Sequence, residues 1–234
     1  MLCIAAGLMH SASAAAEGQL TWGGALSLTS DYVYRGLSQT EGQPAVQGSV
    51  YARSESGWSA GIWASTVNRS AGPGARSEID LQLSKAWTLN PDWNLLLSAN
   101  RYFYPYDNRA QPYEYDELVA SVSYQNRLTA TVSWSPNTSR FSRDEFVRNR
   151  TARSYELTVL QPLAPAWSLY GGVGHYDLKD LFDNGYWYLS GGVSYCVGKL
   201  QMDLSHIDTA HTARRLFDYE VSKRRWNAAL SWRF

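Results

Sequence analysis

The sequence predicts an all-β fold, a transmembrane up-and-down antiparallel β-barrel of about twelve strands. Apolar residues alternate with polar ones along most of the chain, which is the pattern of strands with two different faces. Short turns and longer polar loops alternate between these strands, as in barrels whose strands run up and down. The chain is 44% hydrophobic and 14% aromatic, and its mean hydropathy is −0.36. These values fit lipid-facing residues that alternate with a polar interior.

The first sixteen residues differ from the rest of the chain. Leu2 to Met9 are mostly apolar, and Ser11 to Ala16 are serine and alanine only. This order is typical of a secretory signal peptide, although the basic residues that usually open one are missing. We therefore expect residues 1–16 to be a signal peptide and residues 17–234 to form the barrel domain. A short buried helix is the alternative for the first segment.

In residues 17–234, strands are expected wherever large apolar residues occupy every second position. In chain order, the apolar faces run through Leu20 to Tyr34, Val46 to Ala52, Trp58 to Ala64, Ile79 to Leu83, Trp93 to Ala99, Leu118 to Tyr124, Leu128 to Trp134, Tyr155 to Val159, Trp167 to Val173, Trp187 to Tyr195, Leu200 to Leu204 and Trp226 to Phe234. The strands that contain these faces are expected to be roughly ten residues long, which is the length that a tilted strand needs to cross the hydrocarbon layer.

The connections between these strands fall into two classes. Short turns are expected at 55–57, 90–92, 125–127, 162–165 and 198–199, because Gly, Pro, Asn and Asp favour turns. Longer polar loops are expected between them, among them 36–43, 68–77, 136–150 and 208–222, of which 136–150 is the longest and most charged. This regular alternation favours a barrel over a β-sandwich.

Aromatic residues gather near the strand ends, as in the two aromatic rings of a membrane barrel. The ring at the short-turn end is expected to contain Trp22, Trp58, Trp87, Trp93, Tyr124, Trp167, Tyr195 and Trp232, and the ring at the long-loop end Tyr32, Tyr34, Phe103, Tyr115, Trp134, Trp187 and Trp226. In a soluble sandwich these aromatics would fill a core instead. The opposite faces of the strands are polar, which speaks against that alternative.

The last ten residues form a strand with two faces that ends on an aromatic residue. Leu230, Trp232 and Phe234 stand on its apolar face, with Arg233 on the other. This ending resembles the terminal signature of outer-membrane β-barrels in Gram-negative bacteria. The resemblance implies that these three residues are an assembly signal for the barrel assembly machinery.

Three segments near the start carry a family resemblance. The residues from Leu28 to Thr40 read LTSDYVYRGLSQT, those from Pro44 to Gly48 read PAVQG, and those from Gly57 to Ser65 read GWSAGIWAS. Together they resemble the proteobacterial Gcw-chp family of unknown function, also labelled TorF-type porins. The resemblance implies a channel-like barrel in the bacterial outer membrane. It brings no substrate and no catalytic residues.

Charged residues on the polar faces are expected to line the lumen. This pore-lining set contains Glu78, Asp80, Glu117, Glu156, Asp203, Arg53 and Arg233. Because acids outnumber bases, a water-filled lumen would prefer cations and neutral solutes. We therefore expect passive diffusion of small hydrophilic solutes. In the alternative, side chains fill a narrow barrel and the carboxylates pair with Arg53 and Arg233.

Asp31, Arg35 and Gln39 stand where the first strand meets its loop. They are candidates for a constriction or a solute contact at the mouth of the barrel. The simpler alternative is that Asp31 and Arg35 form a structural ion pair while the neighbouring glycines shape the turn.

Arginines near the long-loop end suggest a lipid partner. Arg101 and Arg153 fall on outward positions, and Arg214 and Arg215 lie in the last loop. Guanidinium groups match phosphate oxygens, so contact with lipopolysaccharide in the outer membrane is expected. A basic loop that is merely solvated is the alternative.

Other functions find little support in the residues. Formal net charge is zero, so no overall field attracts nucleic acid. We expect no enzyme, no metal and no cofactor, since no nucleotide or metal motif occurs. Asp203, Ser205 and His206 would suit a lipid-modifying enzyme only if the strand slipped by one residue and turned His206 inward. A closed barrel that serves structure or adhesion is a further alternative.

Overall fold

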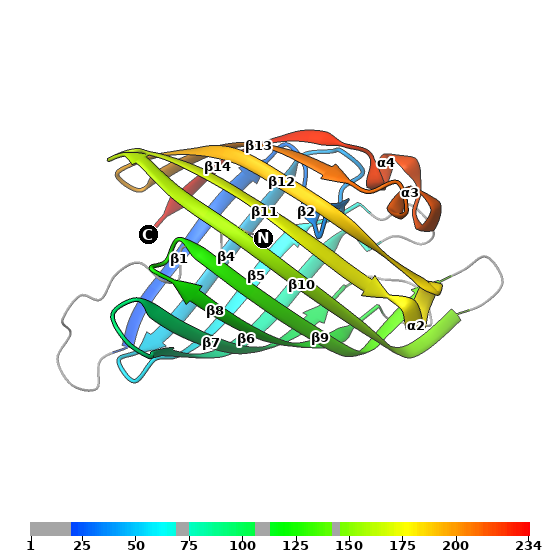
Figure 1. The fold of residues 1–234 in the computed structure, drawn as a ribbon, viewed down its shortest axis with the longest axis horizontal. Helices are drawn as coiled ribbons and strands as arrows, with labels where there is room; N and C mark the ends of the chain where they lie inside the picture. The colour runs from blue at the N-terminus through cyan, green and yellow to red at the C-terminus, as the bar shows by residue number, and fades with distance from the viewer. Residues whose placement is uncertain (1–19, 69–74, 106–112, 142–145) are drawn as a thin grey trace.

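The computed structural model describes residues 20–68, 75–105, 113–141 and 146–234. The expected signal peptide at 1–16 lies outside these residues. Twelve strands form one closed barrel, in which each strand pairs with its neighbours in the chain and β1 pairs with β14 (Figure 1). The strands of the wall are β1 (Leu20–Thr29), β4 (Ala45–Ser54), β5 (Trp58–Thr66), β6 (Ser77–Thr88), β7 (Trp93–Phe103), β8 (Tyr115–Tyr124), β9 (Leu128–Phe141), β10 (Phe146–Ala164), β11 (Trp167–Leu178), β12 (Asn184–Val197), β13 (Leu200–Thr209) and β14 (Arg225–Arg233).

All these pairings are antiparallel, and closure joins the two ends of the chain. Leu28 of β1 stands opposite Leu230 of β14. Beyond the last strand, Gly24 donates its N–H to the carbonyl of Phe234 at 3.0 Å, and Phe234 donates to that of Gly24 at 3.1 Å. Closure matters because an unpaired strand edge in lipid would cost several kcal/mol for each unsatisfied group. The fold class and the strand count of the sequence-based prediction are confirmed.

The two faces of the wall follow the alternation of the sequence. Large apolar side chains such as Leu28, Ile62 and Leu204 are exposed on the outer face. Their inward neighbours are mostly small and polar, and Ser59 and Ser84 for example share a hydrogen bond of 2.7 Å across β5 and β6. This is the arrangement of a wall between lipid and a polar lumen.

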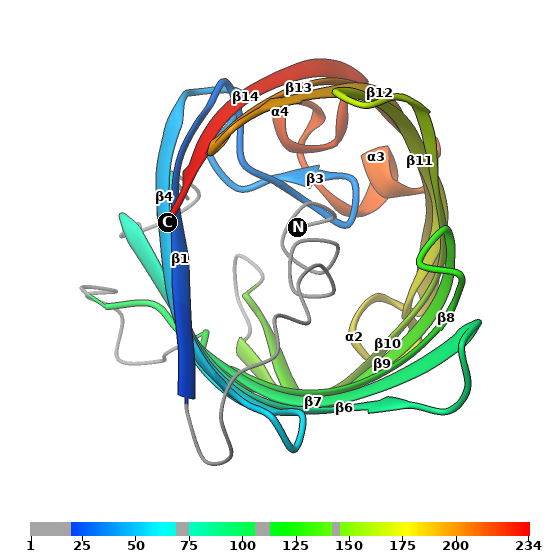
Figure 2. The ribbon, with the colours of Figure 1, turned by 90° about the vertical axis from the view of Figure 1, so that its left-hand side faces the viewer.

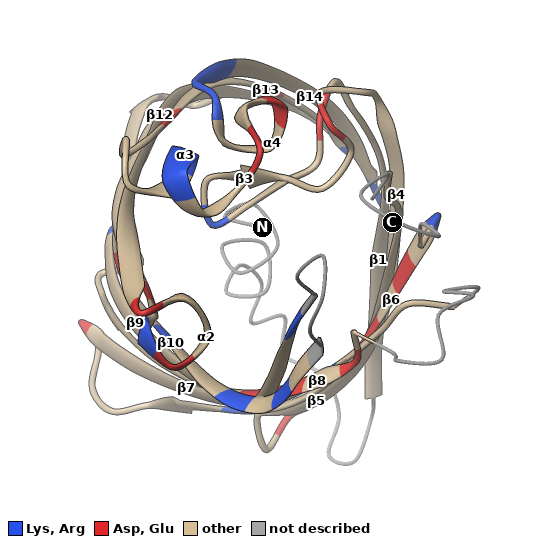
Figure 3. Cartoon of the chain, turned by 90° about the vertical axis from the view of Figure 1, so that its right-hand side faces the viewer, with Lys and Arg blue, Asp and Glu red and all other residues tan. Residues whose placement is uncertain are grey.

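Short segments fill part of the ring at the long-loop end. They are β2 (Val33–Tyr34), β3 (Leu37–Ser38), α2 (Lys179–Phe182), α3 (Ala213–Leu216) and α4 (Tyr219–Ser222). Figures 2 and 3 show β3 and the helices inside the outline of the barrel. Among the described residues, no helix is long and apolar enough to span a membrane. We call Val33–Ser38, which forms β2 and β3, the lumen hairpin.

The prediction of an outward-facing ring of aromatic residues is correct at the short-turn end of the barrel and partly wrong at the long-loop end. Trp22, Trp58 and Trp167 are exposed on the outer face, as are Trp134, Trp187 and Trp226 towards the long loops. Three tyrosines differ from the prediction, because they belong to the interior. Tyr32 is buried and Tyr34 packs beside it on the hairpin, while Tyr115 stacks on Tyr102 with ring centroids 4.2 Å apart.

The expected loop at 136–150 is also wrong in its extent. β9 continues to Phe141 and β10 begins at Phe146, so most of this segment is strand. The register shifts between Val147 and Ala152. Polar residues such as those at 137–140 can pair as strands beyond the apolar band, where no apolar face is required.

Candidate functional site

The lumen hairpin is the element that positions the candidate site. Arg35 and Gly36 form its two-residue turn, with φ angles of 48° and 78°. Two positive φ angles are typical of the turn that matches the twist of a hairpin. Glycine is required at position 36, because an added Cβ would lie 2.7 Å from Thr209 Oγ1 and from Tyr188 Cβ. The turn therefore sits tightly against β12 and β13.

Two clusters of apolar residues hold the hairpin from opposite sides. Tyr34 of the hairpin packs against a cluster that contains the adjoining Tyr32 together with Trp63 of β5 and Tyr102 of β7. Leu37 belongs to a second cluster with Leu181, Tyr186, Tyr188 and other residues of α2, α3, β10 and β12. Burial of such side chains stabilises the docked hairpin by roughly 1.5–3 kcal/mol each. The long-loop half of the lumen is thus packed around the hairpin.

Arg35 reaches from the tip of the hairpin to the far wall. Its guanidinium donates to Glu117 Oε2 at 2.7 Å and to Ser133 Oγ at 2.6 Å. The side chains of Arg35 and Glu117 are only 7% and 3% exposed. Burial disfavours the charge on Arg35, but the Glu117 carboxylate more than offsets this and raises the pKa of Arg35 well above its ordinary value. Arg35 therefore remains a cation inside the lumen.

Further hydrogen bonds fix the backbone of the turn. Tyr186 donates its hydroxyl to the carbonyl of Arg35 at 3.0 Å, and Thr209 donates to the carbonyl of Gly36 at 2.7 Å. The Arg35 guanidinium also lies 4.8 Å from the ring centroid of Tyr176. The hairpin is thus tied to the wall on β8, β9, β12 and β13, and it crosses the lumen.

Asp31 lies at the base of the hairpin and does not pair with Arg35. Its Oδ1 accepts hydrogen bonds from Ser38 at 2.6 Å and from Thr40 at 2.7 Å. Its Oδ2 forms a buried ion pair with Arg225 of β14. The expected Asp31–Arg35 pair is therefore wrong, since Arg35 instead pairs with Glu117. The turn points Arg35 away from Asp31 and across the lumen.

The sequence did not single out Arg225 as a site residue, although its place on the inward face of the last strand could have indicated a role in the lumen. It shares the inward face of the last strand with Asn227 and is buried. Its guanidinium donates to the carbonyls of Glu220 at 2.6 Å and Val221 at 3.0 Å. Arg225 thus joins α4 to the base of the hairpin. An arginine on the inward face of a strand needs a partner, which sequence alone does not name.

We expect Arg225→Met to destabilise the barrel by about 3–5 kcal/mol, because it leaves the buried Asp31 carboxylate without its cation. Unfolding in urea from lipid vesicles, followed by tryptophan fluorescence, measures this loss. Lys223→Met is the matched control, since its ion pair with Glu220 is solvent-exposed and such pairs contribute at most about 1 kcal/mol. Equal losses in the two variants would contradict the central role of the Asp31–Arg225 pair.

The third mouth candidate, Gln39, is buried at the base of the hairpin. Its side-chain amide donates to the carbonyl of Leu37 at 3.1 Å, and its backbone N–H donates to that of Tyr32 at 2.6 Å. These bonds hold the shape of the hairpin. Asp31 and Gln39 therefore lie at the base of the lumen hairpin, whereas Arg35 lies at its tip and extends across the lumen.

The expected pore-lining residues are distributed over the inner wall. Glu78, Asp80 and Glu117 are buried on β6 and β8, and Asp203 is buried on β13. Asp203 accepts hydrogen bonds from Gln201 at 2.9 and 2.8 Å, and the hydroxyl of Tyr188 on β12 donates to Glu156 on β10, two strands away in the sheet. Arg53 and Arg233, the two basic residues of the expected set, also stand at inward positions of their strands.

These basic residues lie towards the short-turn end. Arg53 stands opposite Ser59 on β4 and β5. Arg233 is at the end of β14, where it donates a hydrogen bond to Gln201. The carboxylate of Glu117 thus pairs with Arg35 of the hairpin, not with either arginine of the wall. For Glu117, the alternative of pairing with Arg53 or Arg233 is therefore wrong, because its cation comes from the hairpin.

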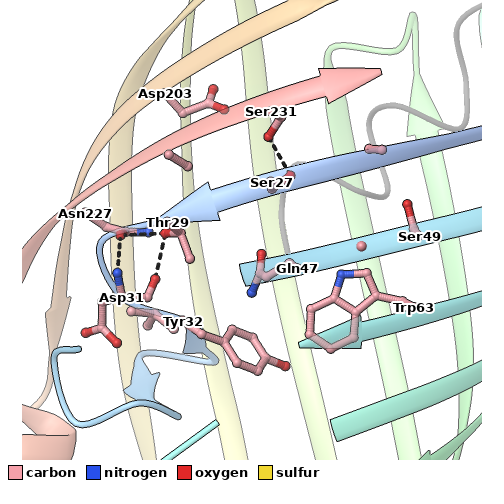
Figure 4. Close-up of a pocket in the computed structure, with 14 residues that line it drawn as sticks. Ser27, Thr29, Asp31, Tyr32, Gln47, Ser49, Trp63, Asp203, Asn227 and Ser231 are labelled. Carbon is pink, nitrogen blue, oxygen red and sulfur yellow. Dashed lines mark hydrogen bonds between the residues drawn. The ribbon is translucent and has the colours of Figure 1, made fainter. Parts of the chain in front are cut away.

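Between the hairpin and the short-turn end, the lumen contains two adjoining cavities. One, of about 120 Å³, is lined by Ser27, Asp31, Asp203 and neighbouring residues (Figure 4). The other, of about 160 Å³, includes Asp80 and Arg233 in its lining. Ser27, Ser49, Trp63 and Ser231 line both. The interior is thus packed near the long loops and hollow below the hairpin.

The arginines proposed for lipid contact occupy different surroundings. Arg101 is paired with Glu114 at 2.8 Å and Asp116 at 3.0 Å. Arg153 is exposed on β10, opposite Asp177 of β11. Arg214 lies 3.8 Å from Asp208, and Arg215 is exposed beside it on α3. The four side chains do not form one cluster.

The register of β13 decides one alternative from the sequence. Ser205 and Asp203 are buried in the lumen, whereas His206 stands opposite the exposed Trp226, with ring centroids 5.0 Å apart. The slip that would turn His206 inward is therefore absent. Within the described residues, no group of three or more His, Cys, Asp or Glu could hold a metal ion.

Comparison with solved structures shows that the chain shares its β-barrel fold with outer-membrane porins and channels. The NanC porin matches with a TM-score of 0.58 at 10% identity, covering 88% of this chain and 97% of that chain. The KdgM porin gives 0.54 at 6% identity, with 91% and 98% covered, and the CymD monoaromatic hydrocarbon channel gives 0.51 at 12% identity, with 93% and 88% covered. At these identities the likeness shows the fold alone.

The family is shown by sequence. Residues 13–232 match the family described as bacterial protein of unknown function (Gcw_chp), and the chain belongs to this family. The resemblance seen in its first three strands is therefore confirmed over nearly the whole length. No curated protein matches the chain.

Proposed function

We propose that this protein is a channel of the bacterial outer membrane that admits small hydrophilic solutes by passive diffusion and prefers cations. One observation carries the proposal. The lumen is hollow and polar below the hairpin, with acidic side chains such as Asp80 and Asp203 in its lining. A polar cavity inside a wall whose outer face is apolar suits the passage of water-soluble molecules through lipid.

The proposal assigns distinct roles to the lumen residues. Glu78 and Asp80 on β6 set a negative potential, which attracts cations. The lumen hairpin narrows the passage at the long-loop end, where the buried ion pair between Arg35 and Glu117 connects its tip to the far wall. Transport is not catalysed, so the channel needs neither a cofactor nor a reacting side chain. The solute then crosses by diffusion along its own gradient.

We expect the double variant Glu78→Gln/Asp80→Asn to lower the cation-to-anion permeability ratio at least about twofold, because it removes the two acidic side chains of β6 from the lumen. Reversal potentials of single channels in planar bilayers under a potassium chloride gradient measure this ratio. Glu55→Gln is the control, since it removes a charge from the exposed β4–β5 turn. A ratio that stays unchanged in the double variant would refute the assigned role of β6.

The same recording decides between the channel and a closed structural barrel. The packing around the hairpin and its buried ties favours the closed alternative, in which the loops are the working surface. Stable current steps from the folded wild type support the channel. A folded, inserted protein that stays silent would overturn the proposal in favour of the closed barrel.

We further propose that lipopolysaccharide phosphates contact the outer arginines. Arg153 has the most suitable surroundings, because it is exposed on the outer face. Arg101 is less free, since two carboxylates already occupy its guanidinium. We expect Arg153→Ala to reduce the lipopolysaccharide that is retained after detergent purification at least about twofold. Unchanged retention would remove Arg153 from the contact.

A further inference from the structure

We propose that the cavity beside Asp80 binds the alkylammonium group of a small organic solute. This inference rests on the proposed function, in that it takes the cavity as part of the solute path. The first supporting observation is the state of Asp80. Its side chain lines the cavity of about 160 Å³ and is only 5% exposed. Among the residues that the structure describes, neither of its carboxylate oxygens has a hydrogen-bond partner.

The other lumen carboxylates are each bonded to a neighbouring side chain. Glu78 accepts a hydrogen bond from the Tyr32 hydroxyl at 3.2 Å, and Glu117 accepts one from that of Tyr102 at 3.1 Å. Asp203 is bonded to Gln201. Asp80 differs from all of these. A buried carboxylate without a donor costs free energy, and a cationic ligand in the cavity would offset that cost.

Aromatic residues flank Asp80 on both neighbouring strands. In the register of the sheet, Asp80 stands directly opposite Trp63 of β5 and Tyr102 of β7. Side chains in directly opposed positions have Cβ atoms about 5 Å apart. Trp63 also packs on Tyr32, with ring centroids 5.2 Å apart (Figure 4). A carboxylate between aromatic rings is the chemistry that recognises organic ammonium groups.

The remaining lining favours an organic cation over a metal ion. Divalent metal ions prefer several oxygen ligands at once, whereas here one carboxylate stands between two rings. The amides of Gln82 and Asn100 complete the polar side of the cavity. A cavity of about 160 Å³ holds on the order of ten water molecules, which is room for a small amine or quaternary ammonium compound.

One basic residue shares the cavity and offers a second contact. Arg233 lies in its lining near the short-turn end, where Gln201 accepts one of its hydrogen bonds. Its other guanidinium N–H groups could hold a carboxylate. An ammonium group could therefore arrive as a simple cation or as part of a zwitterion, with the same contact to Asp80 in both cases.

Calorimetric titration of the full refolded chain in detergent tests the inference without requiring conduction. The probes are choline, a cation; glycine betaine, a zwitterion; and dimethylbutanol, the neutral carbon isostere of choline. We expect saturable binding of choline by the wild type and no saturable binding of the isostere. If betaine binds more tightly than choline, and if Arg233→Gln abolishes this difference in affinity, the preferred ligand is a zwitterion.

Variants assign the binding to the Asp80 cavity. Asp80→Asn keeps the shape and removes the acidic group that can pair with a bound cation, so choline affinity should fall at least about tenfold. Trp63→Leu keeps the charge and removes a ring, and should weaken binding about fivefold. Glu55→Gln should leave binding unchanged. Folding of each variant is checked by heat-dependent migration in gels.

The outcomes separate this inference from the proposed channel. Choline binding that Asp80→Asn leaves unchanged, an isostere that binds equally well, or no saturable binding would overturn the inference. If the protein binds ammonium compounds but passes no current, the ammonium site is supported and the channel function is rejected. Current without ammonium binding keeps the channel and overturns the inference.

Discussion

Arg35→Ala should raise the single-channel conductance at least about twofold, because the side chain that crosses the lumen is removed. The truncation also leaves Glu117 as a buried carboxylate without its cation, which weakens the docking of the hairpin by about 3 kcal/mol. Both effects widen the passage at the long-loop end. Recordings in planar bilayers at one salt concentration measure the conductance of the wild type and the variant side by side.

Two further variants show whether the hairpin itself is responsible. Glu117→Gln removes the charge from the far wall and keeps its shape, so it should raise conductance less than Arg35→Ala does. Arg127→Ala, in the exposed β8–β9 turn, removes an arginine that has no contact with the lumen hairpin. It should leave conductance unchanged. A folded Arg35→Ala variant with the conductance of the wild type would show that the hairpin does not limit flow.

Deletion of Phe234 should lower the amount of folded barrel in the outer membrane at least about tenfold. The deletion removes two backbone hydrogen bonds between the chain end and Gly24, and so weakens closure between the first and last strands. We propose that Phe234, Trp232 and Leu230 together form the assembly signal. The deletion removes the terminal aromatic residue of that signal. Outer-membrane fractions and gel migration without heating measure folded protein.

A single substitution separates these two contributions. Phe234→Ala keeps the backbone hydrogen bonds and removes the ring, which packs beside Trp232 with centroids 5.2 Å apart. A loss as large as that of the deletion would assign the effect to recognition of the ring. Leu163→Ala removes an exposed apolar side chain on β10 and is the control. If Phe234→Ala assembles as the wild type does, the ring is not an assembly signal.

The wall of the barrel could be predicted from the sequence because its two faces meet different surroundings. Lipid outside and a polar lumen inside impose the alternation directly, so Leu28, Ile62 and Leu204 were placed correctly by parity alone. Each strand then pairs with its neighbour in the chain. In such a topology, the order of segments also gives the order of the sheet.

The lumen hairpin could not be predicted in this way. Tyr32 and Tyr34 continue the parity of the first strand, yet β1 ends at Thr29 and the chain turns inward. The partners of the charged residues were equally hidden, since Asp31 binds a residue 194 positions away. Periodicity describes which face a residue occupies. It carries no information on which distant residue shares that face in the closed barrel.

These distant ties also set an order of assembly. The hairpin follows the first strand of the wall, but its partners arrive much later in the chain, at separations of 82 residues for Glu117, 151 for Tyr186 and 173 for Thr209. Loop-closure entropy disfavours contacts between such remote segments until the strands between them are in place. The hairpin therefore docks as the last strands arrive, and the interior of this protein is completed together with its wall.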